Sequence, residues 1–398
     1  MYVPVSLLST RKWVIARLAV DSENRSAGIR LARWLSLLLR VFSSAPPLNH
    51  RAARPSFLAG LDSPTPLPRH VITKKPMVPS LVTIVIPCFN YRHYLAKAID
   101  SAQAQQYRPF EVIVVDDGST DDSATVAEHS GVRLIRQPNA GLGAARNAGL
   151  AEAAGEFVIF LDADDELLPD AVATGVTVLR ARPAVSCVVR LCQLMNAQGR
   201  ELPAHHRDVD TEELYREWLH ANFVWTPGAA MFRRDRIAEI GGFPAELGPA
   251  SDYAVYLALA RAGEVALDPR EVIRYRQHDR NMSLDPVLML RAVLGVLRRE
   301  RTMAPDVYHS DLRVSRRSWR QYYSEQIIQR LRRDWRTGGL GWWHTSAVWT
   351  LARHTPTLMF RQIRIKLSRV IRGNAPAALE RGRFNSDVSE PAAKSMRG

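Results

Sequence analysis

Short β-branched runs that alternate with helical segments constrain the fold of this chain more than any other feature. The first run, at residues 81–86, reads LVTIVI, a composition typical of a strand buried on both faces. Strands separated by helices predict an α/β fold with a parallel sheet, in which ligands bind at the carboxyl ends of the strands. We expect strands at 81–86, 110–115, 132–135 and 156–161, and a helix at 142–153. A further helix is expected after Asn90, which is a candidate for its N-cap. Its apolar face shows helical spacing and consists of Leu95, Ala98, Ile99 and Ala102.

The second half of the chain is less regular. A strand or loop at 222–232 precedes a short helix at 234–240, which Gly241 and Gly242 end. A helix at 252–262, a strand at 271–275 and Arg-rich helices beyond 289 follow. We therefore expect four regions: a basic, Pro-rich and poorly ordered extension at 1–76, an α/β domain at 77–288, a basic Trp/Arg-rich helical region at 289–372, and a disordered tail at 373–398. Met77, just before the first strand, is a candidate translation start.

Charge is unevenly distributed along the 398 residues. The net charge is +14, yet residues 77–288 carry 20 Lys and Arg against 29 Asp and Glu, whereas residues 289–398 carry 22 against 8. An acidic body with basic ends argues against nucleic-acid binding and fits attachment to an anionic membrane surface. The alternative is a set of solvated helix faces. No run approaches the roughly 18–20 apolar residues of a spanning helix.

Five of the nine tryptophans lie in the basic C-terminal region. Amphipathic helices with Arg and Trp bind well at a lipid headgroup layer, and a helical cap that buries its Trp on the α/β domain is an equal alternative. Binding of single-stranded nucleic acid is a third, weaker interpretation of the same pattern. The three cysteines, Cys88, Cys187 and Cys192, show no zinc spacing and are expected to pack as small apolar residues.

Two acidic clusters follow predicted strands. Residues 116–121 read DDGSTD and suit hydrogen bonds to ribose hydroxyls or a base; the alternative is an Asx-type turn. Residues 162–165 read DADD, and carboxylates at alternate positions suit Mg²⁺ or Mn²⁺, which take one or two carboxylates plus substrate phosphates. The alternative here is an acidic turn that leads into a helix near Pro169.

Four sequence blocks, in this order, resemble the family 2 glycosyltransferases with the GT-A fold: TIVIPCFNYRHYL, EVIVVDDGSTDDS, NAGLGAARNAGL and GEFVIFLDADD. The resemblance implies a Rossmann-like GT-A domain with a mostly parallel, nucleotide-binding sheet at 77–288. Its nucleotide-binding half is expected at 77–180 and its acceptor half at 181–288. It also implies an inverting, metal-dependent transferase that uses a nucleotide-sugar, with a UDP-sugar as first candidate. The nucleotide-sugar contacts that it implies are Pro87, Phe89, Asn90, Asp116, Asp117, Gly141, Arg146, Asn147 and Asp162. The metal ligands that it implies are Asp162, Asp164 and His278, the last from the family-like segment YRQHDRNMS.

The catalytic base that the resemblance implies is Asp252. The family carries an acidic pair at the start of an aromatic helix; here Ser251 replaces the first acid and Ala254 a later one. One carboxylate suffices to deprotonate an acceptor hydroxyl. The alternative role for Asp252 is a carboxylate favoured by the helix dipole.

The sequence thus predicts an enzyme of cell-surface polysaccharide or glycolipid synthesis that transfers sugar to a glycan or lipid-linked acceptor. We expect it in the cytoplasm, peripheral on the inner face of the plasma membrane, with no nucleic-acid partner. A non-catalytic nucleotide-sugar-binding or scaffold protein is the alternative. A nucleotidyltransferase is disfavoured, because PCFNYRH lacks the Gly-rich phosphate loop expected after the first strand.

Overall fold

The computed structural model describes residues 79–337 and 341–357. The expectations for 1–76 and 373–398 lie outside the described residues. The chain divides into two compact units: one holds the described residues up to Gln329, and the other those from Arg330 onward.

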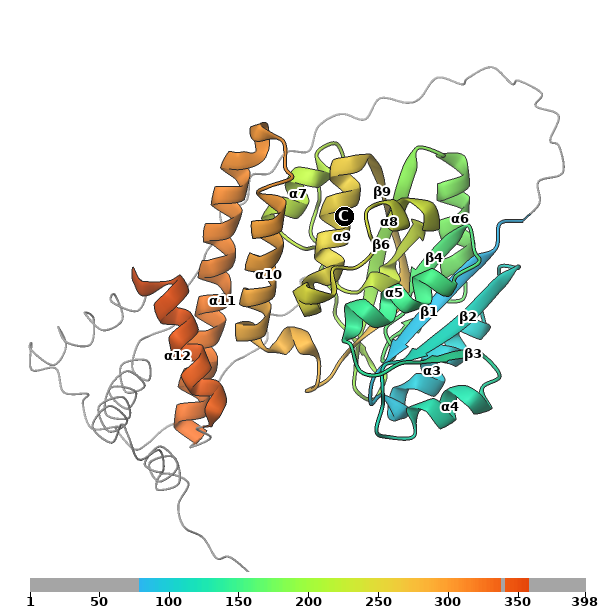
Figure 1. Cartoon of the computed structure of the whole chain (residues 1–398), viewed down its shortest axis with the longest axis horizontal. Helices are drawn as coiled ribbons and strands as arrows, with labels where there is room; N and C mark the ends of the chain where they lie inside the picture. Colours follow the sequence, from blue (N-terminus) through green and yellow to red (C-terminus); the bar gives the residue numbers. More distant parts are fainter. Residues whose placement is uncertain (1–78, 338–340, 358–398) are drawn as a thin grey trace, which may run out of the picture. The chain divides into compact units, whose positions relative to one another are not determined.

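Residues 82–160 form the parallel half of the sheet (Figure 1), in the strand order β3-β2-β1-β4. Its strands are β1 (Val82–Cys88), β2 (Phe110–Asp116), β3 (Arg133–Arg136) and β4 (Phe157–Phe160). The helices between them are α3 (Arg92–Gln103), α4 (Ser123–His129) and α5 (Leu142–Glu152). The four strands expected in this half are confirmed within two residues at each end.

The second half adds antiparallel pairs to the same sheet. Strand β8 (Ala230–Arg233) lies antiparallel between β4 and β6 (Val185–Asn196), and β6 runs parallel to β9 (Glu264–Gln277). The short strands β5 (Glu166–Leu167) and β7 (Glu201–Leu202) pair antiparallel with β9 and β6. The sheet is therefore mixed, and the expected α/β fold is confirmed. Strand β6 is absent from the sequence prediction, and β9 is longer than the predicted 271–275.

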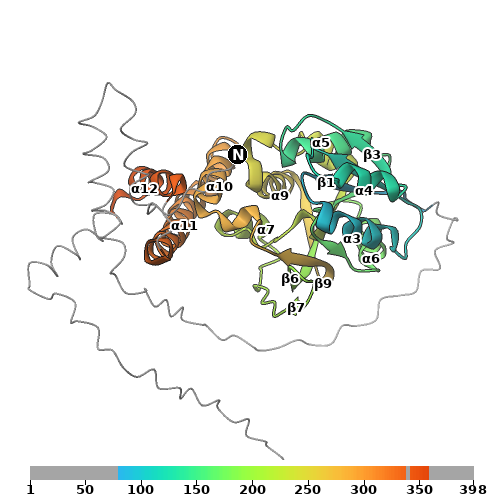
Figure 2. The ribbon, with the colours of Figure 1, turned by 90° about the horizontal axis from the view of Figure 1, so that it is seen from below.

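Figures 1 and 2 show the remaining helices, the last of which belongs to the unit that begins at Arg330. They are α6 (Ala171–Ala181), α7 (Leu214–His220), α8 (Arg234–Glu239), α9 (Ser251–Ala262), α10 (Pro286–Glu300), α11 (His309–Thr337) and α12 (Trp342–His354). Single 3₁₀ turns occur at Pro227–Ala229, Ala245–Ala250, Met282–Leu284 and Asp306–Tyr308. Within the described ranges, no helix combines the length and the apolar character that crossing a bilayer requires.

Close packing of α5 on the sheet positions its first turn beside the strand ends. A Cβ on Gly149 would lie only 2.2 Å from Cγ1 of Val85 in β1, so only a glycine allows this approach. In α3, the predicted apolar face is buried; it consists of Leu95, Ala98, Ile99 and Ala102. All three cysteines are buried, as expected of small apolar residues.

Asn90 does not cap α3, contrary to the sequence interpretation. Tyr91 occupies the cap position without a side-chain hydrogen bond, and Asn90 adopts a left-handed conformation with φ 61°. Its carboxamide oxygen accepts hydrogen bonds from the backbone N–H groups of Thr120 and Asp121 instead, at 2.8 and 3.3 Å. Asn90 thus ties the loop after β1 to the loop after β2.

Candidate active site

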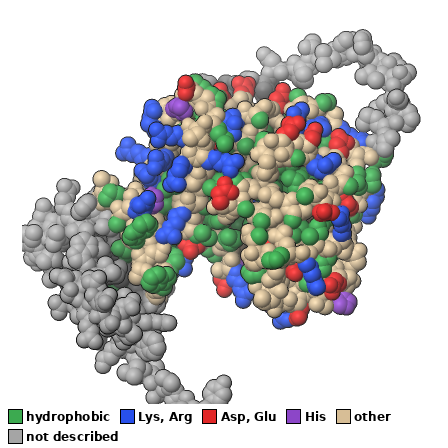
Figure 3. Space-filling model, viewed as in Figure 1, with side chains coloured by type: hydrophobic (Ala, Val, Ile, Leu, Met, Phe, Trp, Pro, Cys, Tyr) green, Lys and Arg blue, Asp and Glu red, His purple; other side chains and the backbone are tan. Residues whose placement is uncertain are grey.

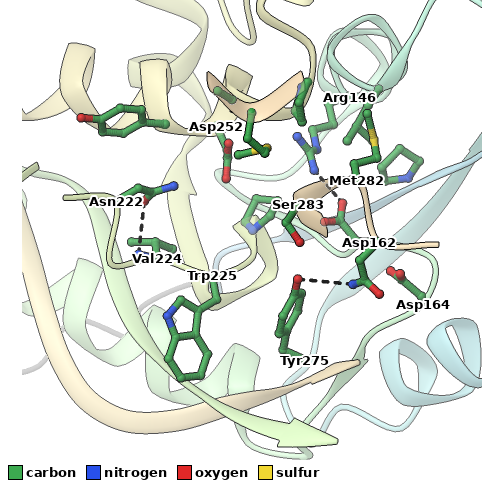
Figure 4. Close-up of a pocket in the computed structure, with 18 of the residues that line it drawn as sticks. Arg146, Asp162, Asp164, Asn222, Val224, Trp225, Asp252, Tyr275, Met282 and Ser283 are labelled. Carbon is green, nitrogen blue, oxygen red and sulfur yellow. Dashed lines mark hydrogen bonds and ion pairs between the residues drawn. The ribbon is translucent and has the colours of Figure 1, made fainter. Parts of the chain in front are cut away.

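A pocket of about 1210 Å³ opens where β1, β2 and β4 end (Figure 4). This is the edge at which α/β sheets bind ligands. Nine residues singled out from the sequence line it: Pro87, Phe89, Asn90, Asp117, Gly141, Arg146, Asp162, Asp164 and Asp252. Three do not: Asp116, Asn147 and His278.

The two aspartates after β2 have different surroundings. Asp116 accepts a hydrogen bond from the backbone N–H of Ser119 at 3.1 Å, which is the Asx-type turn considered as the alternative. Asp117 accepts three hydrogen bonds, from the Gln137 side chain at 2.7 Å and from the N–H groups of Ala140 and Gly141 at 2.9 Å. Asp117 therefore fixes the loop that begins α5.

Arg146 of α5 is the buried cation of the pocket. Its side chain is 3% exposed, and it donates a 2.7 Å hydrogen bond to Asp162. Burial alone would lower the pKa of Arg146, but the charges of Asp162 and Asp252 outweigh it and raise the pKa. The Nε atom of Arg146 has no hydrogen-bond partner among the described residues. One buried guanidinium therefore balances carboxylates from two parts of the chain.

Asp252 lies in the first turn of α9, and its side chain faces the cavity (Figure 4). Burial raises the pKa of Asp252 to about 6; the charge of Arg146 lowers it and that of Asp162 raises it. A carboxyl group with this pKa is a stronger base than an exposed one and remains ionised at neutral pH. Neither Ser251 nor Ala254, which depart from the family pattern, lines the pocket.

The DADD segment divides its carboxylates between the pocket and the protein interior. Burial raises the pKa of Asp162, despite Arg146. Asp164 contacts Nε2 of His278 at 2.8 Å, and Nδ1 of this histidine accepts the N–H of Arg280 at 3.2 Å. The imidazole stacks on Tyr94, with ring centroids 5.2 Å apart. His278 thus sits behind Asp164 rather than in the pocket wall.

Asp165, Glu166 and Arg276 hold the DADD turn in place, a set that sequence reasoning did not find. Arg276 of β9 is fully buried, and its Nε donates to the carbonyl of Asp164 at 2.7 Å. Its backbone N–H donates to Asp165 at 2.9 Å, and its guanidinium pairs with Glu166. Burial and the charges of Asp164 and Asp162 raise the pKa of Asp165 well above its usual value. The sequence signal that could have pointed to Arg276 is the Tyr275-Arg276 pair shortly before His278.

Asn147 of α5 holds the backbone at Phe243 in place. Its carboxamide exchanges two 2.8 Å hydrogen bonds with the backbone of Phe243, and a Cβ on Gly242 would lie 2.4 Å from its oxygen. The side-chain polar groups of Asn147 are thereby satisfied within the protein.

The fold and the pocket define a class. A parallel strand set with DDGSTD and DADD at its carboxyl edge, extended by a mixed half that supplies Asp252, is the α/β architecture of the GT-A glycosyltransferases. Residues 83–241 match the family model described as "Glycosyl transferase family 2".

Curated relatives share only part of their length with this chain. A chondroitin synthase of Escherichia coli is 31% identical over 46% of this chain and 27% of its own length. An uncharacterized glycosyltransferase of Rickettsia typhi is 29% identical over 50% of this chain and 64% of its own. The chain thus spans less than two thirds of these relatives.

Among solved structures, the mannosyltransferase from Pyrobaculum calidifontis in complex with GDP-Man and Mn²⁺ is 19% identical, with a TM-score of 0.48 over 75% of this chain and 89% of that one. S. aureus TarS is 18% identical, with a TM-score of 0.46 over 62% and 43%. Likeness at this level carries no argument about function.

Asp117→Asn tests the loop anchor. The new amide group would face three N–H donors, so we expect a loss of about 1–3 kcal/mol in the free energy of unfolding. Chemical denaturation measures the change, with Asp122→Asn as the control, since the Asp122 side chain is 70% exposed. Equal stabilities of the two variants would contradict the role.

Proposed function

We propose that this protein transfers a sugar from a nucleoside-diphosphate sugar to an acceptor hydroxyl, with inversion at the anomeric carbon. The observation that carries the proposal is one pocket that holds Arg146, Asp162 and Asp164 together with Asp252, a carboxylate whose pKa is about 6. A single base suits a single displacement, in which the attacking oxygen and the leaving group lie on opposite faces of the sugar.

Each residue has a definite task in this reaction. Asp252 removes the proton from the acceptor hydroxyl, which attacks the anomeric carbon as the bond to the diphosphate breaks. Arg146 keeps its positive charge at every working pH and offsets the negative charge of the departing diphosphate. Pro87, Phe89 and Asp117 border the space for the nucleoside.

The pocket also fits a divalent cation, Mg²⁺ or Mn²⁺. Asp162 and Asp164 would hold it, and when bound it would neutralise the diphosphate and favour its departure. No group of three or more His, Cys, Asp and Glu within the described residues is arranged as a complete metal site. That agrees with a cation that takes one or two carboxylates and completes its shell with substrate phosphates and water. His278 contacts the carboxylate of Asp164 and would orient it or join the shell.

We propose a UDP-sugar as donor and cell-surface polysaccharide or glycolipid synthesis as the pathway class. Support for the polysaccharide comes from the matched relatives, two of which are named chondroitin synthases. The non-catalytic alternative rested on Ser251 and Ala254. It loses weight because neither position lines the pocket, whereas Asp252 does.

We also propose attachment to an anionic membrane surface from the cytoplasmic side. In α12, Trp342 is 84% exposed and Trp349 is 56% exposed, with the Arg353 guanidinium 5.3 Å from the Trp349 ring. In α11, Arg313, Arg316 and Arg317 are exposed, and Figure 3 shows Lys and Arg side chains gathered over that helix. Exposed Trp beside Arg suits a headgroup layer. Trp319 instead packs on Tyr253, so the cap interpretation holds for that residue.

Donor binding tests the metal assignment. UDP-GlcNAc, UDP-glucose and GDP-mannose with Mn²⁺ are screened by thermal shift, because a ligand of the native state raises the melting temperature. We expect a shift that EDTA abolishes and that Asp164→Asn lacks. Asp170→Asn, at an exposed carboxylate, is the control. Normal donor affinity in Asp164→Asn would refute the metal ligand, and no shift with any donor would count against the proposed function.

Transfer kinetics test the base. Asp252→Asn should lose about 10²–10⁴-fold in kcat with little change in donor affinity. Because only the ionised carboxylate accepts a proton, the rate of the natural protein should fall as pH drops through about 6. Asp235→Asn, also in the first turn of a helix, controls for the helix dipole. A near-normal rate in Asp252→Asn would leave Asp252 a structural carboxylate.

Vesicle pelleting tests the membrane proposal. The protein should pellet with anionic phosphatidylserine vesicles at low salt, release at 1 M salt, where the Debye length falls to about 3 Å, and ignore neutral vesicles. Replacing Trp342 and Trp349 with serine should weaken pelleting, whereas Val307→Ser, at an exposed position, should not. Equal binding to neutral and anionic vesicles, or none to either, would oppose attachment.

A further inference from the structure

One part of the pocket wall is built by α11 and by the loop after α7, outside every motif that the sequence singled out. Ser318, Trp319, Tyr322 and Tyr323 come from α11, and His220, Asn222, Val224 and Trp225 come from the end of α7 and the loop that follows. In Figure 4, Asn222 and Trp225 lie on the side of Asp252 away from Asp164. This wall, here called the aromatic wall, adjoins the base rather than the diphosphate side.

The rings of the aromatic wall are held in a fixed arrangement. Trp319 and Tyr323 are one helical turn apart and stack, with centroids 5.5 Å apart and an interplanar angle of 13°. Tyr322 meets Tyr323 edge to face at 5.0 Å. Tyr253, which follows the base directly in α9, packs on Trp319 at 6.2 Å and donates its hydroxyl to the carbonyl of Trp218. A preorganised platform therefore stands next to Asp252.

The charge of the aromatic wall restricts its ligand. The two arginines that line the pocket are Arg146, paired with Asp162, and Arg280, whose N–H bonds His278 beside Asp164. Neither belongs to the aromatic wall, and His220 of the wall contacts Asp311. The charge of Arg146 acts on Asp252 but is already shared with Asp162, so an anionic acceptor beside Asp252 would gain little from it.

The polar groups of the aromatic wall favour a sugar over an alkyl chain as its ligand. A pyranose ring has apolar C–H faces and a rim of hydroxyls, so it needs flat aromatic surface together with hydrogen-bonding groups. The Asn222 oxygen accepts the N–H of Val224 at 3.2 Å, and Figure 4 shows its nitrogen turned toward the cavity. Ser318 adds an exposed hydroxyl. The pocket of about 1210 Å³ exceeds the roughly 300–1,000 Å³ of a typical ligand site, which leaves room for a donor and a further ring.

We infer that the aromatic wall is the acceptor subsite and that it takes an uncharged saccharide ring, packed in the corner between Trp319 and Tyr322, whose ring planes meet at 85°, with one hydroxyl directed to Asp252. This inference rests on the proposed function, because it assigns the acceptor of the same reaction. It makes α11 a specificity-determining element, although the helix lies outside the segment that matches the family model.

Release of the nucleoside diphosphate distinguishes cleavage of the donor from recognition of the acceptor. UDP-GlcNAc, UDP-glucose and GDP-mannose are incubated with the full chain and Mn²⁺, alone and with acceptors. The neutral acceptors are cellobiose, maltose, lactose and N,N′-diacetylchitobiose, and the anionic ones are cellobiouronic acid and glucose 6-phosphate. We expect slow release by hydrolysis without acceptor and stimulation by a neutral disaccharide. No release with any donor would overturn the proposed function itself.

Variants of α11 then test the subsite. Tyr322 is 53% exposed, so Tyr322→Ala should fold normally, and it should raise the acceptor KM about 2- to 12-fold. Tyr322→Phe should restore it, and Trp319→Ala should raise it at least as much. Hydrolysis without acceptor is measured in parallel, so that a change in donor chemistry is distinguished from a change in acceptor binding. Val314→Ala, also 53% exposed on α11 but absent from the pocket lining, is the matched control.

Three results would contradict the acceptor subsite. Hydrolysis that no neutral disaccharide stimulates, faster transfer to the anionic sugars, or an unchanged acceptor KM in Tyr322→Ala would each overturn it while leaving donor chemistry intact.

Discussion

The buried ion pair between Arg146 and Asp162 is the interaction on which the pocket depends. It joins α5 to the residues after β4, with N···O at 2.7 Å, and the charge of Asp252 in α9 also raises the pKa of the guanidinium. Loss of one partner of such a pair costs about 3–5 kcal/mol, because an uncompensated charge stays buried. Here the loss would also remove the cation that keeps three acidic groups compatible within one cavity. The pair is therefore both a structural joint and the electrostatic centre of the proposed reaction.

The fold and the pocket residues could be predicted from the sequence wherever they depend on a local pattern. Strands β1 to β4 follow from β-branched runs, and their carboxyl ends bring DDGSTD and DADD to one edge because parallel strands end on the same side. Asp117, Asp164 and Asp252 consequently line a single pocket, as the four blocks and the helix start implied. Their chemical roles remain proposals, since position alone does not assign a reaction.

The sequence was insufficient where a residue acts across the fold. Arg276 binds the carbonyl of Asp164 from 112 positions away, and that contact exists only because β9 enters the sheet beside β6. Asn90 looked like a helix cap, but its oxygen finds the N–H groups of the neighbouring loop, 30 and 31 positions on. Strand β6 was not predicted, although its sequence begins with the apolar run VSCVVRLC. Tertiary contacts of this kind override local propensity and are not written in spacing.

The acceptor side of the pocket carries little charge. Ser251 and Ala254, which depart from the family pattern, lie outside the pocket lining, whereas Asp252 and His220 belong to it. A less charged site holds an acceptor less through ionic hydrogen bonds and must use contact area instead. The aromatic wall supplies that area from α11, whose Trp319 and Tyr322 lie well beyond the matched segment 83–241. Under the proposed function, donor and acceptor would thus be recognised by different physical means. Charge balance around Arg146 would serve the diphosphate, and aromatic surface next to Asp252 would serve the acceptor.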